Sequence, residues 1–358
     1  MLNTVSAAAK FHDLVSGRRR GAGAALARLG LAAASVPYGA GVRLKNLLFA
    51  AGWKTAHRAA VPVVSVGNLT LGGTGKTPCV EYLARFYRDR GVRVTILSRG
   101  YGADRGPNDE ALVLEDNLTD VPHLQGADRV ALAEVAVEEL EAELLILDDG
   151  FQHRRLARDL DLVLLDATDP FGRGRLFPRG LLREPPSSLA RADAVLLTRC
   201  DQVPESAVTE LTSRVRTLAP GRPVVPTTHA SVAWVQHGHP DRPPDSLRGR
   251  PVAAFCGIGN PEAFRRTLGD VGVEPTAFRT FPDHHAYTRA DVDDLRSWAR
   301  QQPTDAALVT TQKDLVKLRI DRLGERDLLA LRVGLQVRPG PDADDLHRRL
   351  DAIRPPAD

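Results

Sequence analysis

The chain has 358 residues, of which 43% are hydrophobic, and a net charge of only +3, so it can bury one large or two ordinary cores. Cys79, Cys200 and Cys256 lack a Cys-x-x-Cys spacing and histidine partners, so neither a disulfide framework nor a zinc site is implied, and a reducing compartment fits. Alternating strand and helix patterns indicate the α/β class, and we expect two domains.

The first 60 residues are strongly basic, with nine lysines and arginines against the single acid Asp13. Apolar residues recur there at helical spacing, at Leu44, Leu47, Leu48 and Ala51. Residues 21–42 are apolar except for Arg28 but are broken by Pro37, which falls short of the roughly 20 apolar residues of a clean span. We expect an amphipathic, monotopic membrane segment. A helical pair packed on the protein's own core is the alternative, and whether residues 21–42 span or only enter the bilayer stays open.

A buried-strand pattern beginning at Val61 runs into a glycine-rich loop that ends in Gly75-Lys76-Thr77. Such a loop points backbone N–H groups at phosphates, its lysine reaches the β- and γ-phosphates, and its threonine hydroxyl ligates Mg²⁺. The pattern therefore predicts an enzyme that uses ATP or GTP together with Mg²⁺. The expected nucleotide contacts are Thr70, Leu71, Gly72, Gly73, Thr74, Gly75, Lys76 and Thr77.

The rest of the chain alternates between apolar strands and amphipathic helices. After the loop and its helix come strands near 92–97, 144–147, 162–165 and 194–197, with a helix over 128–140. A Pro-, Gly- and His-containing stretch near 224–250 breaks the rhythm. Strands follow near 252–255, 276–281, 306–310 and 328–333, with helices near 262–268 and 289–300. The expected organisation is a membrane-associated helical segment 1–60, a phosphate-loop core domain 61–225, a linker 226–250 and a smaller α/β domain 251–358.

Two acids, Asp148 and Asp149, end the apolar strand near 144–147. Ligands of open parallel sheets lie beyond the carboxyl ends of the strands. We therefore expect Thr77, Asp148 and Asp149 to hold the metal, and either aspartate could ligate it directly. An arginine-rich loop over 171–186 could grip a phosphate or a sugar.

Six blocks in chain order carry a resemblance to one family. They are Val64–Pro78, Ser98–Gly102, the Asp-Asp-Gly-Phe-Gln-His run within Leu147–His153, Pro178–Gly180 with Leu182–Pro185, Phe281–Tyr287 and Thr310–Asp314. Over almost its whole length the chain resembles the tetraacyldisaccharide 4′-kinases of lipid A biosynthesis. The resemblance implies a P-loop NTPase-like parallel sheet with helices on both faces, a smaller second α/β domain and an N-terminal membrane-associated helical segment.

The resemblance also implies an activity and a location. The γ-phosphate of ATP would pass to the 4′-hydroxyl of an acylated glucosamine disaccharide 1-phosphate, giving lipid IVA. The enzyme would lie on the cytoplasmic face of the inner membrane of a Gram-negative bacterium, peripheral or monotopic, with the lipid surface as partner. Neither nucleic acid nor an obligate protein partner is expected.

The resemblance further assigns roles to single residues. It makes Asp109 the base, acting with His284 and alongside Lys76, and it makes Tyr101, Glu110, Arg183 and Glu184 substrate-site residues. The expected boundaries place Asp109 in the first domain and His284 in the second. The role of Lys313 is left open.

Two other functions compete with the lipid-sugar kinase. One is a membrane-associated P-loop GTPase or ATPase switch, or a metal-insertion NTPase, because Thr198-Arg-Cys-Asp201 superficially mimics a guanine-reading loop. The other is a scaffold that has lost turnover, against which the intact Lys76, Thr77, Asp148 and Asp149 argue.

Overall fold

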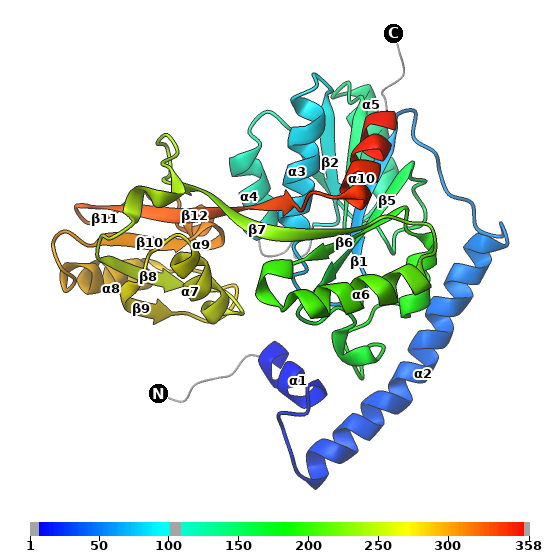
Figure 1. The fold of residues 1–358 in the computed structure, drawn as a ribbon, viewed down its shortest axis with the longest axis horizontal. Coiled ribbons are helices and arrows are strands. Elements are labelled where there is room, and N and C mark those ends of the chain that lie inside the picture. Colours follow the sequence, from blue (N-terminus) through cyan, green and yellow to red (C-terminus); the bar gives the residue numbers. More distant parts are fainter. Residues whose placement is uncertain (1–6, 101–108, 354–358) are drawn as a thin grey trace. The chain divides into compact units, whose positions relative to one another are not determined.

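The computed structural model describes residues 7–100 and 109–353, which divide into two compact units (Figure 1). The described part of the first unit comprises residues 7–99, 120–229 and 335–353. The second unit comprises residues 100, 109–119 and 230–334.

The first unit is built on a parallel sheet in the order β3-β2-β4-β1-β5-β6-β7. Most strands are runs of Val, Ile and Leu that are buried along their length, as parallel strands covered on both faces require. Their carboxyl ends therefore meet at one edge of the sheet. The strands are β1 Val63–Asn68, β2 Val94–Ser98, β3 His123–Gln125, β4 Leu144–Asp148, β5 Leu160–Asp166, β6 Ala194–Thr198 and the beginning of β7 Val224–Val235.

Helices cover both faces of this sheet. Helix α3 (Lys76–Arg88) carries the chain from β1 to β2, whereas α5 (Arg129–Glu138) and α6 (Glu205–Leu218) cross the sheet in the opposite direction. Because such crossovers are right-handed, opposite directions place the helices on opposite faces. Helix α10 (Pro341–Ala352) lies beside α3, where the Tyr87 hydroxyl donates to the Leu350 carbonyl at 3.0 Å. The predicted P-loop NTPase-like fold is confirmed.

The N-terminal region forms helix α1 (Ala7–Val15) and the 29-residue helix α2 (Ala22–Ala50), which continues through Pro37 (Figure 1). Polar contacts tie α2 to the rest of its unit: the Tyr38 hydroxyl donates to the Arg183 carbonyl at 3.0 Å, and Asn46 Nδ2 donates to Glu184 Oε2 at 2.9 Å. None of the helices among residues 7–100 and 109–353 combines the length and the apolar character that crossing a bilayer requires.

The second unit carries a mostly parallel sheet in the order β12-β10-β8-β9, and β11 pairs antiparallel with β12. Side-chain caps fix two of its helices, Asn260 for α7 and a Thr288–Asp291 capping box for α8. The elements are α4 Asp109–Asn117, β8 Val252–Cys256, α7 Pro261–Asp270, β9 Pro275–Thr280, α8 Arg289–Arg300, β10 Ala307–Thr311, α9 Gln312–Leu318, β11 Arg322–Leu323 and β12 Arg326–Val337.

The two units differ from the domains expected from the sequence. Residues 226–250 are not simply a linker, because β7 continues to Val235 and the division falls inside this strand. The chain from 335 onward belongs to the first unit, where α10 packs beside α3. Helix α4, which carries Asp109, belongs to the second unit and not to the kinase core.

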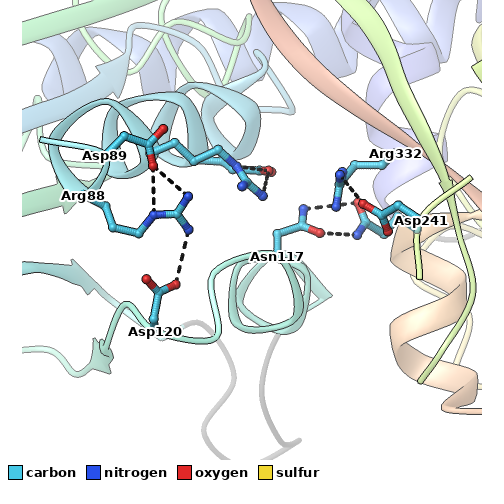
Figure 2. Close-up of polar contacts among 9 residues, drawn as sticks. Arg88, Asp89, Asn117, Asp120, Asp241 and Arg332 are labelled. Carbon is cyan, nitrogen blue, oxygen red and sulfur yellow. Dashed lines mark hydrogen bonds and ion pairs between the residues drawn. The ribbon is translucent and has the colours of Figure 1, made fainter. Parts of the chain in front are cut away.

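Side-chain contacts with α9 tie α4 to the second unit. Within that unit, Asn117 at the end of α4 exchanges hydrogen bonds with Gln312 of α9, and its Nδ2 donates to Gln312 Oε1 at 3.3 Å. Figure 2 labels Asn117 and also draws the contact between Arg332 and Asp241. Within the first unit, Arg88 contacts Asp89 and Asp120.

Candidate active site

The phosphate loop joins β1 to α3 at the carboxyl edge of the first unit's sheet. Gly75 adopts a left-handed φ of 86° directly before Lys76, the first residue of α3. Gly72 has a φ of 112°, and a Cβ at Gly72 or Gly73 would meet no atom within 4 Å. The glycines therefore leave open space above the first turn of a helix, where backbone N–H groups and the helix dipole favour an anion.

An ion-pair chain lies behind this loop. Lys76 Nζ is 3.6 Å from Asp149 Oδ1, and Arg183 Nη1 donates to both oxygens of Asp149 at 2.8 Å. Burial raises the pKa of Asp149, but the two cations outweigh it and hold that pKa below the ordinary value. Asp149 is therefore a carboxylate that orients the lysine of the loop.

The loop backbone is braced from the neighbouring strand β6. Thr198 is fully buried and its hydroxyl donates to the Thr74 carbonyl at 2.8 Å. Arg199 donates to the Gly73 carbonyl at 2.9 Å and pairs with Asp166 at the end of β5. Two consecutive carbonyls of the phosphate loop are thus held by the last residue of β6 and the residue after it, which fixes the orientation of these two peptide groups.

A histidine at the end of the first unit also lies against the loop. A Cβ on Gly75 would be 3.1 Å from His229 Nε2, so the ring packs close against this glycine, whose φ of 86° already disfavours a side chain. Burial, reinforced by Arg199, lowers the pKa of His229 to about 4. The ring is therefore neutral at physiological pH.

A second cluster, the Asp109 cluster, lies within the second unit. His284 Nδ1 is hydrogen-bonded to Asp109 Oδ2 at 2.9 Å, and Lys317 Nζ lies 3.4 Å from the same oxygen. Lys317 is also 3.2 Å from Asp314, whose side chain is fully buried and accepts from the Gly257 N–H at 2.9 Å. The cluster therefore links α4, α9 and the loop that carries His284.

The electrostatics of the Asp109 cluster favour the charged forms of both Asp109 and His284. Burial raises the pKa of Asp109, but the hydrogen bond from His284 and the charge of Lys317 bring it below the ordinary value. The hydrogen bond to Asp109 in turn raises the pKa of His284. His284 adopts a φ of 55°, a conformation that histidine tolerates better than most residues, and its N–H donates to the Gly257 carbonyl. Asp109 is an anion placed to accept or share a proton.

Comparison with known proteins decides the family. The profile of the family described as tetraacyldisaccharide-1-P 4′-kinase matches residues 27–353. A tetraacyldisaccharide 4′-kinase of Anaeromyxobacter sp. (strain Fw109-5) is 41% identical over 355 residues, covering 94% of both chains. One from Anaeromyxobacter dehalogenans (strain 2CP-C) is 43% identical over 312 residues, covering 82% of both. The chain belongs to the tetraacyldisaccharide 4′-kinase family.

A solved structure agrees with this family membership. The crystal structure of LpxK from Aquifex aeolicus in complex with ATP is 31% identical and superposes with a TM-score of 0.73, covering 90% of this chain and 99% of that one. The nucleotide-switch and metal-insertion alternatives gain no support.

The residues expected to hold Mg²⁺ suit that ion. Thr77 is almost buried in the first turn of α3, and Asp148 is the last residue of β4, paired in register with Val66 of β1. Nowhere in the described ranges do three or more His, Cys, Asp or Glu side chains gather closely enough to hold a metal by themselves. A hydroxyl and a carboxylate are hard oxygen donors, and Mg²⁺ ordinarily completes its shell with waters and substrate phosphates.

The residues expected to bind substrate fall into different places. Arg183 lies behind the phosphate loop, where it donates to Asp149. Glu110 pairs with Lys313 at 2.9 Å in the second unit. Glu184 is only 2% exposed and accepts from Asn46 and Arg191, so its carboxylate joins α2 to the unit. Tyr101 lies outside the described residues.

Sequence reasoning missed Thr198, Arg199 and Lys317. The sequence did hold a signal for Thr198 and Arg199, because they stand at the end of an apolar strand. The carboxyl ends of parallel strands lie at the same edge of the sheet as the phosphate loop, so residues at these ends are candidates for contact with the loop. The pattern around Lys317 offered less, because only the packing of α9 against α4 brings its ammonium to Asp109.

Proposed function

We propose that this protein transfers the γ-phosphate of ATP to the 4′-hydroxyl of tetraacyldisaccharide 1-phosphate, forming lipid IVA. The observation that carries the proposal is the family match over residues 27–353, together with a phosphate loop whose lysine is oriented by Asp149 and Arg183. Catalysis of phosphoryl transfer consists mostly of positioning and charge stabilisation, and these residues supply both.

The first unit would bind and polarise the nucleotide. The loop from Thr70 to Gly75 would surround the phosphates with N–H donors, and Lys76 would stabilise the charge that develops on the transferred group. Thr77 and Asp148 would hold Mg²⁺, which neutralises phosphate charge when bound. Asp149 is already paired with Arg183 and Lys76. We therefore propose that Asp149 orients Lys76 and does not contact the metal directly.

The second unit would activate the acceptor. Asp109 accepts the proton of the 4′-hydroxyl as the oxygen attacks the γ-phosphorus and ADP leaves. The hydrogen bond from His284 fixes the carboxylate, while Lys317 keeps it ionised. Glu110 is proposed to face the acceptor, and Tyr101, which lies outside the described residues, is proposed as a substrate-site residue from the family resemblance alone.

The acceptor side of the first unit would involve Arg183 and the region of α2. Arg183 offers a planar set of donors beside Asp149. We assign Glu184 a different role from the one expected: it positions α2 through Asn46 and does not touch the acceptor.

An acceptor with four acyl chains stays in a bilayer, so the enzyme must reach the membrane surface. The support is the basic region 1–60 and the exposed apolar side chains of α2, among them Leu26, Leu29 and Val36. We propose a peripheral or monotopic attachment at the cytoplasmic face of the inner membrane.

The test is transfer of labelled γ-phosphate to tetraacyldisaccharide 1-phosphate in detergent micelles. The native chain should give product, and Asp109→Asn should lose most of kcat with little change in ATP affinity. Asp116→Asn, the same change near the other end of α4, serves as the control. Absence of product with the native chain would overturn the proposed function, and equal turnover by Asp109→Asn would remove Asp109 from the base role.

A further inference from the structure

A basic pocket lies in the first unit beside the carboxyl end of α2. Its volume is about 540 Å³, which suits a small ligand or a lipid headgroup. It is lined by Lys45, Phe49, Trp53, Lys54, Thr55, Gln152, His153, Arg154 and Arg155. Four of these side chains are cations and none is a carboxylate.

Two of the cations are fixed at the wall of the pocket. Lys45 Nζ donates to the Gln152 carbonyl at 2.7 Å. Arg154 donates to the Asn46 carbonyl at 3.0 Å, and its guanidinium lies 5.0 Å from the centre of the Phe49 ring. Each contact uses only part of the donor capacity, since an ammonium has three N–H groups and a guanidinium five.

The other two cations are exposed at the mouth. Lys54 is exposed, and Arg155 is 61% exposed with its nearest acid, Asp128, at 3.5 Å. They can turn toward a bound anion at little cost.

His153, which also lines the pocket, is uncharged. Burial, together with Arg129, Arg158, Arg155 and Lys45, lowers the pKa of His153 to about 4. Its buried Nε2 has no hydrogen-bond partner within the described residues. The positive charge of the pocket therefore comes from its lysines and arginines alone.

Trp53, which lines the pocket, is 81% exposed. Leu44 and Leu47 of α2, which do not line the pocket, are 57% and 62% exposed. Exposed tryptophan and leucine next to lysine and arginine are typical of side chains that sit at the boundary between headgroups and acyl chains.

We propose that this pocket binds the phosphate of an anionic membrane phospholipid, with the acyl chains leaving over Trp53. The inference rests on the proposed membrane position of the enzyme and deepens it, because it names the lipid chemistry and the residues that recognise it. Arginine and lysine recognise a phosphate through charge-assisted hydrogen bonds, whereas a zwitterionic headgroup would bring a cation against four others.

Trp53 supplies the first readout. Dihexanoyl phosphatidylglycerol, used below its critical micelle concentration, should give a saturable change in tryptophan emission that disappears in Trp53→Phe. Dihexanoyl phosphatidylcholine should give none, and glycerol 3-phosphate and inorganic phosphate should bind at least about tenfold more weakly because they lack the apolar part. The proposal would be overturned if phosphatidylcholine changed the tryptophan emission as much as phosphatidylglycerol does, or if phosphatidylglycerol gave no saturable change.

A matched pair of variants supplies the second readout. Lys54→Gln/Arg155→Gln removes only the exposed cations, and Arg266→Gln/Arg348→Gln removes two exposed charges elsewhere. In co-sedimentation with vesicles containing phosphatidylglycerol, the first variant should partition at least about tenfold more weakly and the second like the native chain. Equal partitioning of the two variants would contradict a localised site.

Phosphate transfer in detergent micelles separates this site from the proposed kinase activity. Lys54→Gln/Arg155→Gln should leave the KM for the acceptor unchanged there. A KM raised about tenfold would mean that the pocket holds the acceptor's own phosphate, which would overturn the assignment to a phospholipid. Vesicle partitioning needs no turnover, so it tests the pocket even if the native chain transfers no phosphate.

Discussion

Lys317 Nζ lies 3.4 Å from Asp109 Oδ2, which places an ammonium beside the carboxylate that we propose as the base. The same ammonium is 3.2 Å from the buried Asp314, so one cation holds two acids in place. Lys317 is a positioning residue, because it acts through Asp109.

Removing this cation should change the pH dependence of turnover. In Lys317→Met the pKa of Asp109 rises, because burial is then opposed by His284 alone. A base with a higher pKa is protonated at higher pH, so the acidic limb of the kcat profile should move upward in pH. Lys317→Arg should restore the native profile. A profile of unchanged position and lower amplitude in Lys317→Met would indicate a purely structural role.

The Asp109–His284 pair should stabilise the fold only within a pH window. The raised pKa of His284 contributes stability that is fully present below about 6.5 and is lost as pH rises through the folded-state value. The lowered pKa of Asp109 contributes stability that is present above about 3.9 and is lost as pH falls. The difference in thermal midpoint between the native chain and His284→Ala should therefore be largest between about pH 4 and 6.5. A difference that is constant across pH 3–9 would contradict the ionic account.

Truncating the brace on the phosphate loop should weaken nucleotide binding. Thr198→Val removes the donor to the Thr74 carbonyl, at a cost of about 1 kcal/mol, and should raise the KM for ATP roughly fivefold with a smaller effect on the acceptor. Thr209→Val is the matched control, because that hydroxyl donates to an exposed helix carbonyl of the same unit. Steady-state kinetics with each substrate varied would reveal the difference, and equal KM values for ATP in the two variants would exclude the brace.

Replacing the lysine of the loop should affect the chemical step most. Lys76→Met leaves Asp149 paired with Arg183, so the fold should persist while transfer falls roughly 100- to 1000-fold. Arg216→Met, which breaks an exposed ion pair with Asp342, should leave transfer unchanged. Single-turnover transfer compared with ATP affinity measures the effect, and a loss confined to ATP affinity would argue against a role in the chemical step.

Much of the fold follows from local sequence pattern. Buried Val-, Ile- and Leu-rich runs identified β4, β5, β6 and β8, and the run that ends in Gly75-Lys76-Thr77 identified the phosphate loop and the start of α3. These features are local, because strand burial and glycine conformation depend on a few neighbouring residues.

The limits of the second unit could not be derived in the same way. Pro226 and the surrounding glycines and histidines predicted a linker, yet β7 continues through Pro226. Helix α4 follows the kinase-core strands in sequence, but its pairing with Gln312 and Lys313 of α9 assigns it to the second unit. Contacts between residues about 200 apart in sequence leave no local signal.

By itself, the sequence determined the phosphate loop, the acids at the strand ends and the lipid-kinase family, because each is carried by residue types at fixed short spacing. Only the tertiary structure decided that Thr198 and Arg199 hold the carbonyls of the phosphate loop. It also decided that the ammonium of Lys317 lies beside the carboxylate of Asp109, and that the buried carboxylate of Glu184 accepts a hydrogen bond from α2. Those relationships depend on which strand ends and helix faces the fold brings within hydrogen-bond distance, and no spacing along the chain encodes that.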